Sequence, residues 1–324
     1  MNTYFELCTV LCLGIFSLVL LAGSVAADVA AGLLGRFRFG NRLLRSPALL
    51  FALRMFPFAF SSFLTLGLAL PAFLLLEPRQ TGEAPELYLI VLASLSVMGF
   101  ATVGIRLLRV LSATTQISSE WQQRAERIHI AAPIPVFRVE APASLFAVAG
   151  VVRQRVFIGG EALACLTPEE VNAAIAHELA HVRSFDNLKR LALSISRLPR
   201  WLSHLESIDA AWSEAVELAA DEEALKSSAT ALELGSAIVK IGRLHSTTMP
   251  SIAACHLVMS DKSSALAMRL ARLRFLLDHT ARTPARSSRL IPARVLLISI
   301  ILGYLFALPA ALALTHRAME WLVR

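Results

Sequence analysis

Four uncharged stretches, each about as long as a membrane-spanning helix, constrain the fold of this chain more than any other feature. A helix needs about 20 apolar residues to cross the hydrocarbon core of a bilayer. Hydrophobic residues make up 56% of the chain and charged residues only 17%, a balance unlike that of a soluble domain. We therefore predict a mainly α, polytopic membrane protein with four transmembrane helices, at about residues 7–27, 55–76, 87–105 and 295–315.

Charged residues between these stretches predict their orientation. The first connecting loop is rich in arginine, whereas the second carries three glutamates against the single Arg79. Loops with excess positive charge stay in the cytoplasm. The chain is thus predicted to be a multi-pass protein of a bacterial-type inner membrane, with both termini outside. The opening segment MNTYFE has no positive side chain, which favours a retained first span over a cleaved signal peptide.

The same arginines account for much of the net charge of +7. At membrane boundaries, arginine sets the orientation of spans and contacts anionic lipid. The bilayer is therefore the expected partner of the basic residues, and we expect no direct nucleic-acid binding.

The positions of the spans divide the chain into three regions. Residues 1–112 hold the first three spans, residues 113–290 form a cytoplasmic domain, and residues 291–324 hold the fourth span and a short extracytoplasmic tail. Within the cytoplasmic region the pattern predicts an α+β domain, a small β-sheet plus helices. Strands are expected at 136–140, 144–148 and 156–158, and later helices at 188–198, 208–226, 229–244 and 264–277. An edge strand of this sheet could pair with an extended peptide substrate. Alternatively, the strands form a hairpin with a purely structural role, and the sequence pattern fits both.

The five residues His177-Glu178-Leu179-Ala180-His181 predict a zinc site on a helix. Thr167 followed by Pro168 and Glu170 marks the start of that helix. Residues four apart share a helix face, so His177 and His181 can bind one metal ion. Glu178 is then placed to act as general base towards a metal-activated water. This pattern is typical of metal-assisted peptide hydrolysis with one Zn²⁺ per chain.

A catalytic zinc needs a third protein ligand, and Glu217 is the best candidate. It lies in a strongly helical stretch among alanines, valine and leucine, where Asp221 follows it on the same face. Asp221 is predicted to orient a ligating histidine by a hydrogen bond. The alternative is an acidic face exposed to solvent. Asp186 could cap the next helix, or it could form a hydrogen bond that supports one of the zinc ligands.

The whole pattern resembles the BlaR/MecR-type integral-membrane zinc metallopeptidases, which are gluzincins. The resemblance rests on AHELAHVRSFDNLKRL with Asp186, on VELAADEEAL with Glu217 and Asp221, and on the basic helix AMRLARL with Arg269 and Arg272. HtpX and the CAAX-protease-like gluzincins share the HExxH and ExxxD motifs. The arrangement of three spans, a cytoplasmic domain and a fourth span favours the BlaR/MecR type.

The resemblance implies His177, His181 and Glu217 as zinc ligands and Glu178 as general base. Arg269, Arg272 and His256 are open candidates for stabilising the transition state, with core packing as the alternative for His256. The resemblance also implies a cytoplasmic protein as substrate, such as a transcriptional repressor. The chain would then be a regulatory protease that inactivates a repressor.

In members of this family a penicillin-binding sensor follows the fourth span. Here only residues 316–324 follow it, so any stimulus is expected to come through the membrane spans, the short outer loop or a separate sensor protein. Two alternatives remain open. One is an HtpX-like peptidase for membrane-protein quality control, and the other is a non-catalytic membrane signalling protein with a structural zinc.

Overall fold

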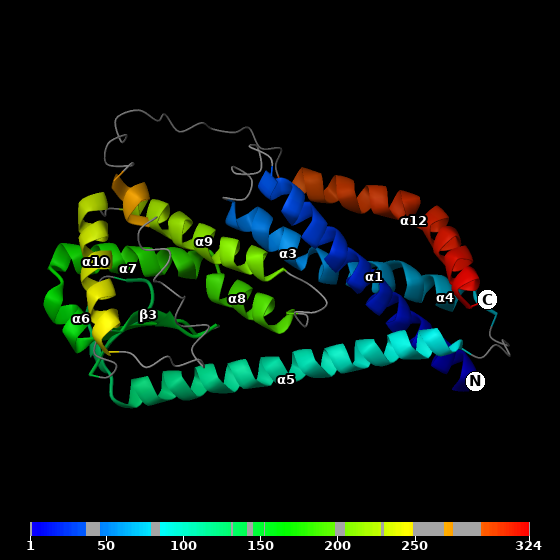
Figure 1. Cartoon of the computed structure of the whole chain (residues 1–324), viewed down its shortest axis with the longest axis horizontal. Coiled ribbons are helices and arrows are strands. Elements are labelled where there is room, and N and C mark those ends of the chain that lie inside the picture. The colour runs from blue at the N-terminus through cyan, green and yellow to red at the C-terminus, as the bar shows by residue number, and fades with distance from the viewer. Residues whose placement is uncertain are drawn as a thin grey trace.

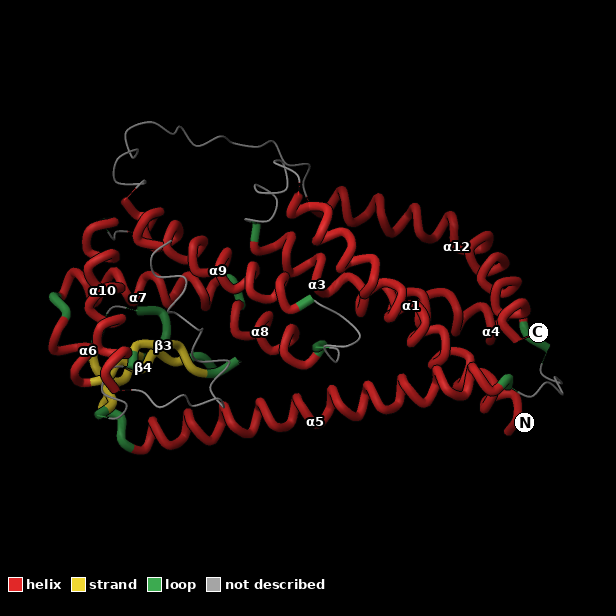
Figure 2. Tube along the Cα trace, in the orientation of Figure 1, coloured by secondary structure: helices red, strands yellow, loops and turns green. Residues whose placement is uncertain are grey.

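The computed structural model describes residues 2–36, 46–78, 85–130, 132–140, 145–151, 153–197, 205–227, 230–248, 269–274 and 293–323. These residues are mainly helical and include a small β-sheet, as predicted (Figure 2). His256 lies outside the described residues, as does most of the predicted helix 264–277, of which residues 269–274 are helical.

Three long apolar helical segments form a bundle at one end of the molecule (Figure 1). The first is α1 (Asn2–Arg36), which packs against the other two. The second consists of α3 (Pro47–Ser62), the π-helical segment η1 (Phe63–Ala69) and α4 (Leu70–Leu76). The third lies in α5 (Leu87–Gln123). All three are long and apolar enough to cross a membrane.

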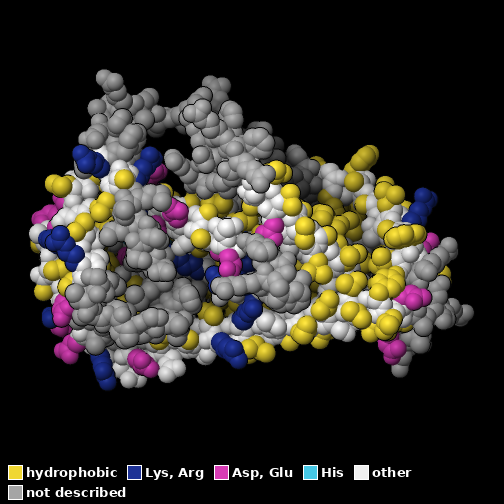
Figure 3. All heavy atoms as spheres, in the orientation of Figure 1, with side chains coloured by type: hydrophobic (Ala, Val, Ile, Leu, Met, Phe, Trp, Pro, Cys, Tyr) yellow, Lys and Arg dark blue, Asp and Glu magenta, His cyan; other side chains and the backbone are white. Residues whose placement is uncertain are grey.

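Hydrophobic side chains gather on the surface of this end, whereas charged side chains are more frequent on the other (Figure 3). The exposed apolar residues include Val25, Leu66, Leu75, Val97 and Leu108, spread over all three segments. Exposed apolar surface of this extent suits contact with lipid. The fourth predicted span falls within α12 (Ala293–Val323), which is helical; its crossing of a membrane stays a prediction.

The second span contains a π-helical segment next to a proline. Pro71 has no N–H to donate to the carbonyl of Gly67, four residues earlier. The hydroxyl of Tyr304 in α12 donates a hydrogen bond of 2.9 Å to that carbonyl. A wide turn and a hydroxyl donor are ways in which a membrane helix tolerates proline. The side chain of Tyr304 thus ties α12 to the middle of the second span.

The helix α5 extends well beyond the predicted span at 87–105. Arg106 ends the uncharged stretch but does not end the helix, which continues without a break to Gln123. At its far end Ile117 and Trp121 pack on the sheet, where the Trp121 ring lies 5.4 Å from that of Phe157. One helix therefore joins the bundle to the sheet.

Four strands form the sheet, in the order β1-β2-β4-β3. They are β1 (Glu126–Ile128), β2 (Val136–Val139), β3 (Phe146–Ala149) and β4 (Arg155–Gly159). Strands β2 and β4 run parallel, and the other neighbours are antiparallel. Gly150 turns the chain between β3 and β4 at φ 99°, where an added Cβ would lie 2.5 Å from the carbonyl oxygen of Arg153. Strand β3 is left at an edge.

Helix α7 (Pro168–Arg183) covers the face of the sheet opposite to the one that α5 contacts. It follows α6 (Gly160–Cys165) and begins with the predicted capping box, in which Thr167 and Glu170 satisfy each other's backbone N–H groups. Its apolar residues, among them Ile175 and Leu179, pack on Phe146 and Ile158. Burial of this face fixes the side of α7 that the histidines occupy.

Helix α9 (Glu206–Ser227) lies between α7 and the apolar helical bundle (Figure 1). Its first half packs Ile208 and Trp212 against Leu50 of α3 and Ala27 of α1. Its second half packs along α7. The short α8 (Asp186–Ile195) connects α7 to this region, and α10 (Ala231–Thr248) covers the outer side of α7.

Candidate metal centre

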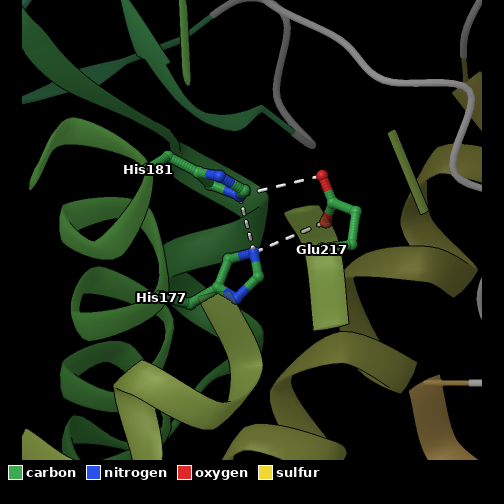
Figure 4. A group of neighbouring side chains, drawn as sticks. All are labelled: His177, His181 and Glu217. Carbon is green, nitrogen blue, oxygen red and sulfur yellow. Dashed lines mark hydrogen bonds and ion pairs between the residues drawn. The ribbon is translucent and has the colours of Figure 1, made fainter. Parts of the chain in front are cut away.

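Two histidines from α7 and one glutamate from α9 converge in the interior (Figure 4). The Nε2 atoms of His177 and His181 are 3.2 Å apart. Glu217 places Oε2 3.6 Å from the first of these nitrogens and Oε1 3.7 Å from the second. All three side chains are buried. The structure therefore brings together the three residues that the sequence suggested as ligands.

These separations fit a zinc ion. Ligand atoms about 2.0–2.1 Å from a tetrahedral ion lie about 3.3 Å from one another. Moreover, the Nδ1 of His181 lies 2.9 Å from Oδ2 of Asp186, and the Nδ1 of His177 lies 2.9 Å from Oδ1 of Asp221. With Nδ1 protonated towards each carboxylate, both Nε2 lone pairs face one another, an arrangement that a bound cation stabilises.

The two aspartates occupy the places that the sequence suggested beside the histidines. Asp186 is the first residue of α8, and its side chain contacts His181, whereas the N-cap position belongs to Phe185 at φ 55°. The capping interpretation of Asp186 is therefore not supported. The contact between Asp221 and His177 is at ion-pair distance, although its angle falls short of a hydrogen bond.

Glu178 lies beside the triad and reaches the edge of the sheet. Its Oε2 accepts a hydrogen bond of 3.3 Å from the backbone N–H of Val148 in β3. The Asn187 amide, from α8, donates to the carbonyl oxygens of Val148 and Gly150 at 3.4 and 3.0 Å. The predicted general base thus sits between the ligand helix and the edge strand.

Of the residues suggested for the transition state, only Arg269 lies at the triad. Its guanidinium donates to both oxygens of Asp221, at 2.8 and 2.6 Å, and its Nη1 is 3.1 Å from Oε2 of Glu217. Arg272 instead pairs with the half-exposed Glu222 at 2.8 Å. His256 is outside the described residues, so its position is not assigned.

Sequence reasoning missed a second arginine at the triad. The Nη2 of Arg190 donates a hydrogen bond of 3.2 Å to Oε1 of Glu217. The only signal in the sequence is that Arg190 follows Asp186 by four residues, so both lie on one face of α8. On this face of α8, Asp186 contacts His181 and Arg190 contacts Glu217.

Neighbouring charges shift the pKa values of two carboxyl groups and one histidine at the site. Burial opposes ionisation of Glu217, but His177, His181 and Arg269 outweigh it and hold the pKa of this carboxyl well below its usual value. Burial likewise opposes the charge on Asp221, and His177 and Arg269 lower the pKa of this carboxyl. Burial and Arg269 oppose protonation of His177, yet Asp221 and Glu217 raise the pKa of its ring.

Negative charge is in excess around the triad. Among the described residues, four buried carboxylates face two guanidiniums, and a nearby ammonium is about one third exposed and therefore screened by solvent. The carboxylates belong to Glu178, Asp186, Glu217 and Asp221, the guanidiniums to Arg190 and Arg269, and the ammonium to Lys189. A divalent cation would neutralise this excess, which agrees with the ligand geometry.

Comparison with known proteins bears on part of this region. The profile of Peptidase family M48 matches residues 112–211, which include the end of α5, the sheet, α7 and α8. The matched segment contains the HELAH residues and ends before Glu217. No curated protein matches the chain. Over residues 112–211 the chain is therefore similar to the zinc metallopeptidases of family M48.

Proposed function

We propose that this chain is a zinc-dependent membrane endopeptidase that hydrolyses peptide bonds of a cytoplasmic protein. The observation that carries the proposal is the convergence of His177, His181 and Glu217 on a site of zinc dimensions, with Glu178 beside it. The similarity to family M48 over the same helix supports it. A structural zinc site would need no such carboxylate next to its ligands, which disfavours the non-catalytic alternative.

The proposed chemistry assigns a task to each side chain. His177, His181 and Glu217 would hold the ion, and Asp186 and Asp221 would fix the orientation of the two rings. A zinc ion in this place supplies a Lewis acid and lowers the pKa of water towards about 7. Glu178 takes the proton of the attacking water and passes it to the amine that leaves.

The edge of β3 supports an extended protein segment as substrate. The backbone N–H and carbonyl of Val148 point away from β4, since they contact side chains of α7 and α8. A peptide that adds to this edge would exchange those contacts for main-chain hydrogen bonds. Its scissile bond would then lie next to Glu178, which bonds to the same residue of the strand.

We further propose that the site faces the cytoplasm of a bacterial-type inner membrane. The support is the excess of arginine in the first loop and of glutamate in the second. With the fourth span in α12, both termini would lie outside. We propose a regulatory substrate such as a transcriptional repressor, and a separate membrane partner as sensor.

A substitution of Glu178 tests the proposed activity. The Glu178→Gln variant should keep its fold and its zinc but lose cleavage by at least about a hundredfold, because general-base catalysis contributes about 10²–10⁴. Glu169→Gln is the matched control, since Glu169 is exposed on the same helix. Zinc content is measured by elemental analysis of the full chain in detergent. Undiminished cleavage by Glu178→Gln, or absence of stoichiometric zinc, would overturn the proposal.

Capture of substrates with the same inactive variant tests the proposed role. A single repressor retained by Glu178→Gln, and released by the active chain as fragments, would support regulation. A broad set of misfolded membrane proteins would instead favour quality control. Capture from cells that express Glu169→Gln gives the background for both.

A further inference from the structure

The two oxygens of Glu217 have different environments. Oε1 accepts the hydrogen bond of 3.2 Å from Arg190, whereas Oε2 is buried and has no hydrogen-bond partner in the described structure. The nearest cation to Oε2, Nη1 of Arg269, is 3.1 Å away but not directed at it. An unbonded buried carboxylate oxygen keeps its lone pairs free for a cation.

The two arginines are also held differently. Arg269 is 7% exposed, and both of its hydrogen bonds to carboxylate go to Asp221. Arg190 is 13% exposed, and Glu217 is its acceptor within the described structure. Arg269 therefore directs its hydrogen bonds to Asp221 and lies only at ion-pair distance from Oε2 of Glu217, whereas Arg190 is the hydrogen-bond donor to Oε1.

We propose that Arg190 is a positioning residue that makes Glu217 a ligand through one oxygen. A carboxylate with two free oxygens can bind an ion through both and fill the position that a catalytic zinc leaves open. A guanidinium that holds Oε1 prevents this, because a charge-assisted hydrogen bond competes for the same lone pairs. The inference rests on the proposed zinc site and adds the reason why its fourth position stays open to water.

The backbone of α8 fits this role. Asp186 fixes one end of the helix at His181, and Arg190 reaches Glu217 from the next turn. Helix α8 also packs against α5 and α3, so it has a rigid support on the side of the bundle. The position of Arg190 relative to both histidines is therefore fixed by the contacts of α8.

The test replaces zinc by Co²⁺, whose visible absorption is stronger in four-coordinate than in five-coordinate sites. The full chain in detergent is titrated with Co²⁺ as wild type, as Arg190→Met and as Arg183→Met. Arg183 is a matched control, because it is 55% exposed at the end of α7 and its ion pair with Glu223 is long, at 4.0 Å. We expect four-coordinate spectra for wild type and Arg183→Met, and the weaker five-coordinate spectrum for Arg190→Met. Zinc affinity of Arg190→Met, measured with a competing chelator, should change by less than about tenfold.

The possible failures are distinguishable. A four-coordinate Co²⁺ spectrum in Arg190→Met, identical to that of wild type, overturns the role of Arg190 and leaves the proposed function intact. A wild-type chain that binds no Co²⁺ overturns the metal site and the inference with it. If Arg190→Met does not fold, Arg190→Gln also removes the guanidinium, and the same five-coordinate spectrum is expected from it.

Discussion

Arg54 of α3 donates a hydrogen bond of 2.9 Å to Asp209 of α9, and both side chains are buried. Arg197 bonds to the other oxygen of Asp209 at 3.2 Å. Asp209 lies at the start of the helix that carries Glu217 two turns later. A buried charge pair therefore joins a candidate membrane span to the helix of the third candidate ligand.

Removal of Arg54 should destabilise the fold strongly. Arg54→Met leaves Asp209 buried, with the half-exposed Arg197 as its remaining partner among the described residues, and loss of one member of a buried pair costs about 3–5 kcal/mol. Arg197→Met should cost less than about 1 kcal/mol. Denaturant unfolding of the purified chain measures both. Equal effects of the two substitutions would contradict a dominant role for the Arg54 pair.

Removal of the Asp186 side chain should weaken zinc binding. Without the carboxylate, the ring of His181 loses the contact that sets its orientation and its protonated nitrogen. Partners of this kind are worth about 10–100-fold in metal affinity. Competition with a chromophoric chelator gives the affinity of Asp186→Ala and of the exposed control Ser184→Ala. An unchanged affinity for Asp186→Ala would show that His181 is held by other contacts.

Glu170 should make the stability of the domain depend on pH. Burial opposes its charge, but Lys240, Ser236 and the backbone N–H of Thr167 outweigh burial and lower the pKa of this carboxyl. Because the folded pKa lies below the unfolded value of about 4.3, the stabilisation is complete above that value and is lost as the pH falls through the folded pKa.

Thermal unfolding between pH 3 and pH 7 tests this dependence. The difference in melting temperature between wild type and Glu170→Gln should be largest near pH 7 and should shrink below about pH 4.3. Glu169→Gln, which alters an exposed neighbour, should follow the wild type throughout. A difference that stays constant over the whole range would refute the assignment.

Tyr304→Phe should loosen the contact between α12 and the second span. It removes the only hydroxyl donor that the described structure places on the Gly67 carbonyl. Hydrogen bonds between membrane helices contribute about 0.6–1.7 kcal/mol, so the expected loss is of that size. Unfolding in detergent compares it with Tyr88→Phe, in which the altered ring is 45% exposed. A loss no greater than that of Tyr88→Phe would mean that the hydrogen bond contributes nothing.

Features of the fold that depend on local interactions could be predicted from the sequence. The start of α7 follows from Thr167 and Glu170, which bond to each other across three residues. The placement of Glu217 towards the interior follows from its apolar neighbours. Strand β1 could not be predicted, because two of its three residues, Glu126 and Arg127, are charged and exposed.

Contacts between distant elements could not be predicted in the same way. The bond from Arg190 to Glu217 and that from Arg54 to Asp209 join residues with no shared period or motif. Arg106 predicts the end of the third span at Ile105, yet the charge does not end the helix, which continues to Gln123. Only the packing of Trp121 on the sheet shows why α5 continues.

The unbroken course of α5 fixes the distance between the bundle and the sheet. Beyond Ile105 the helix continues to Gln123, and at 1.5 Å per residue this part is about 27 Å long. A continuous helix is stiff, so the sheet that Trp121 contacts is held at about that distance from Ile105. A tilt of α5 within the bundle would therefore move the sheet with it.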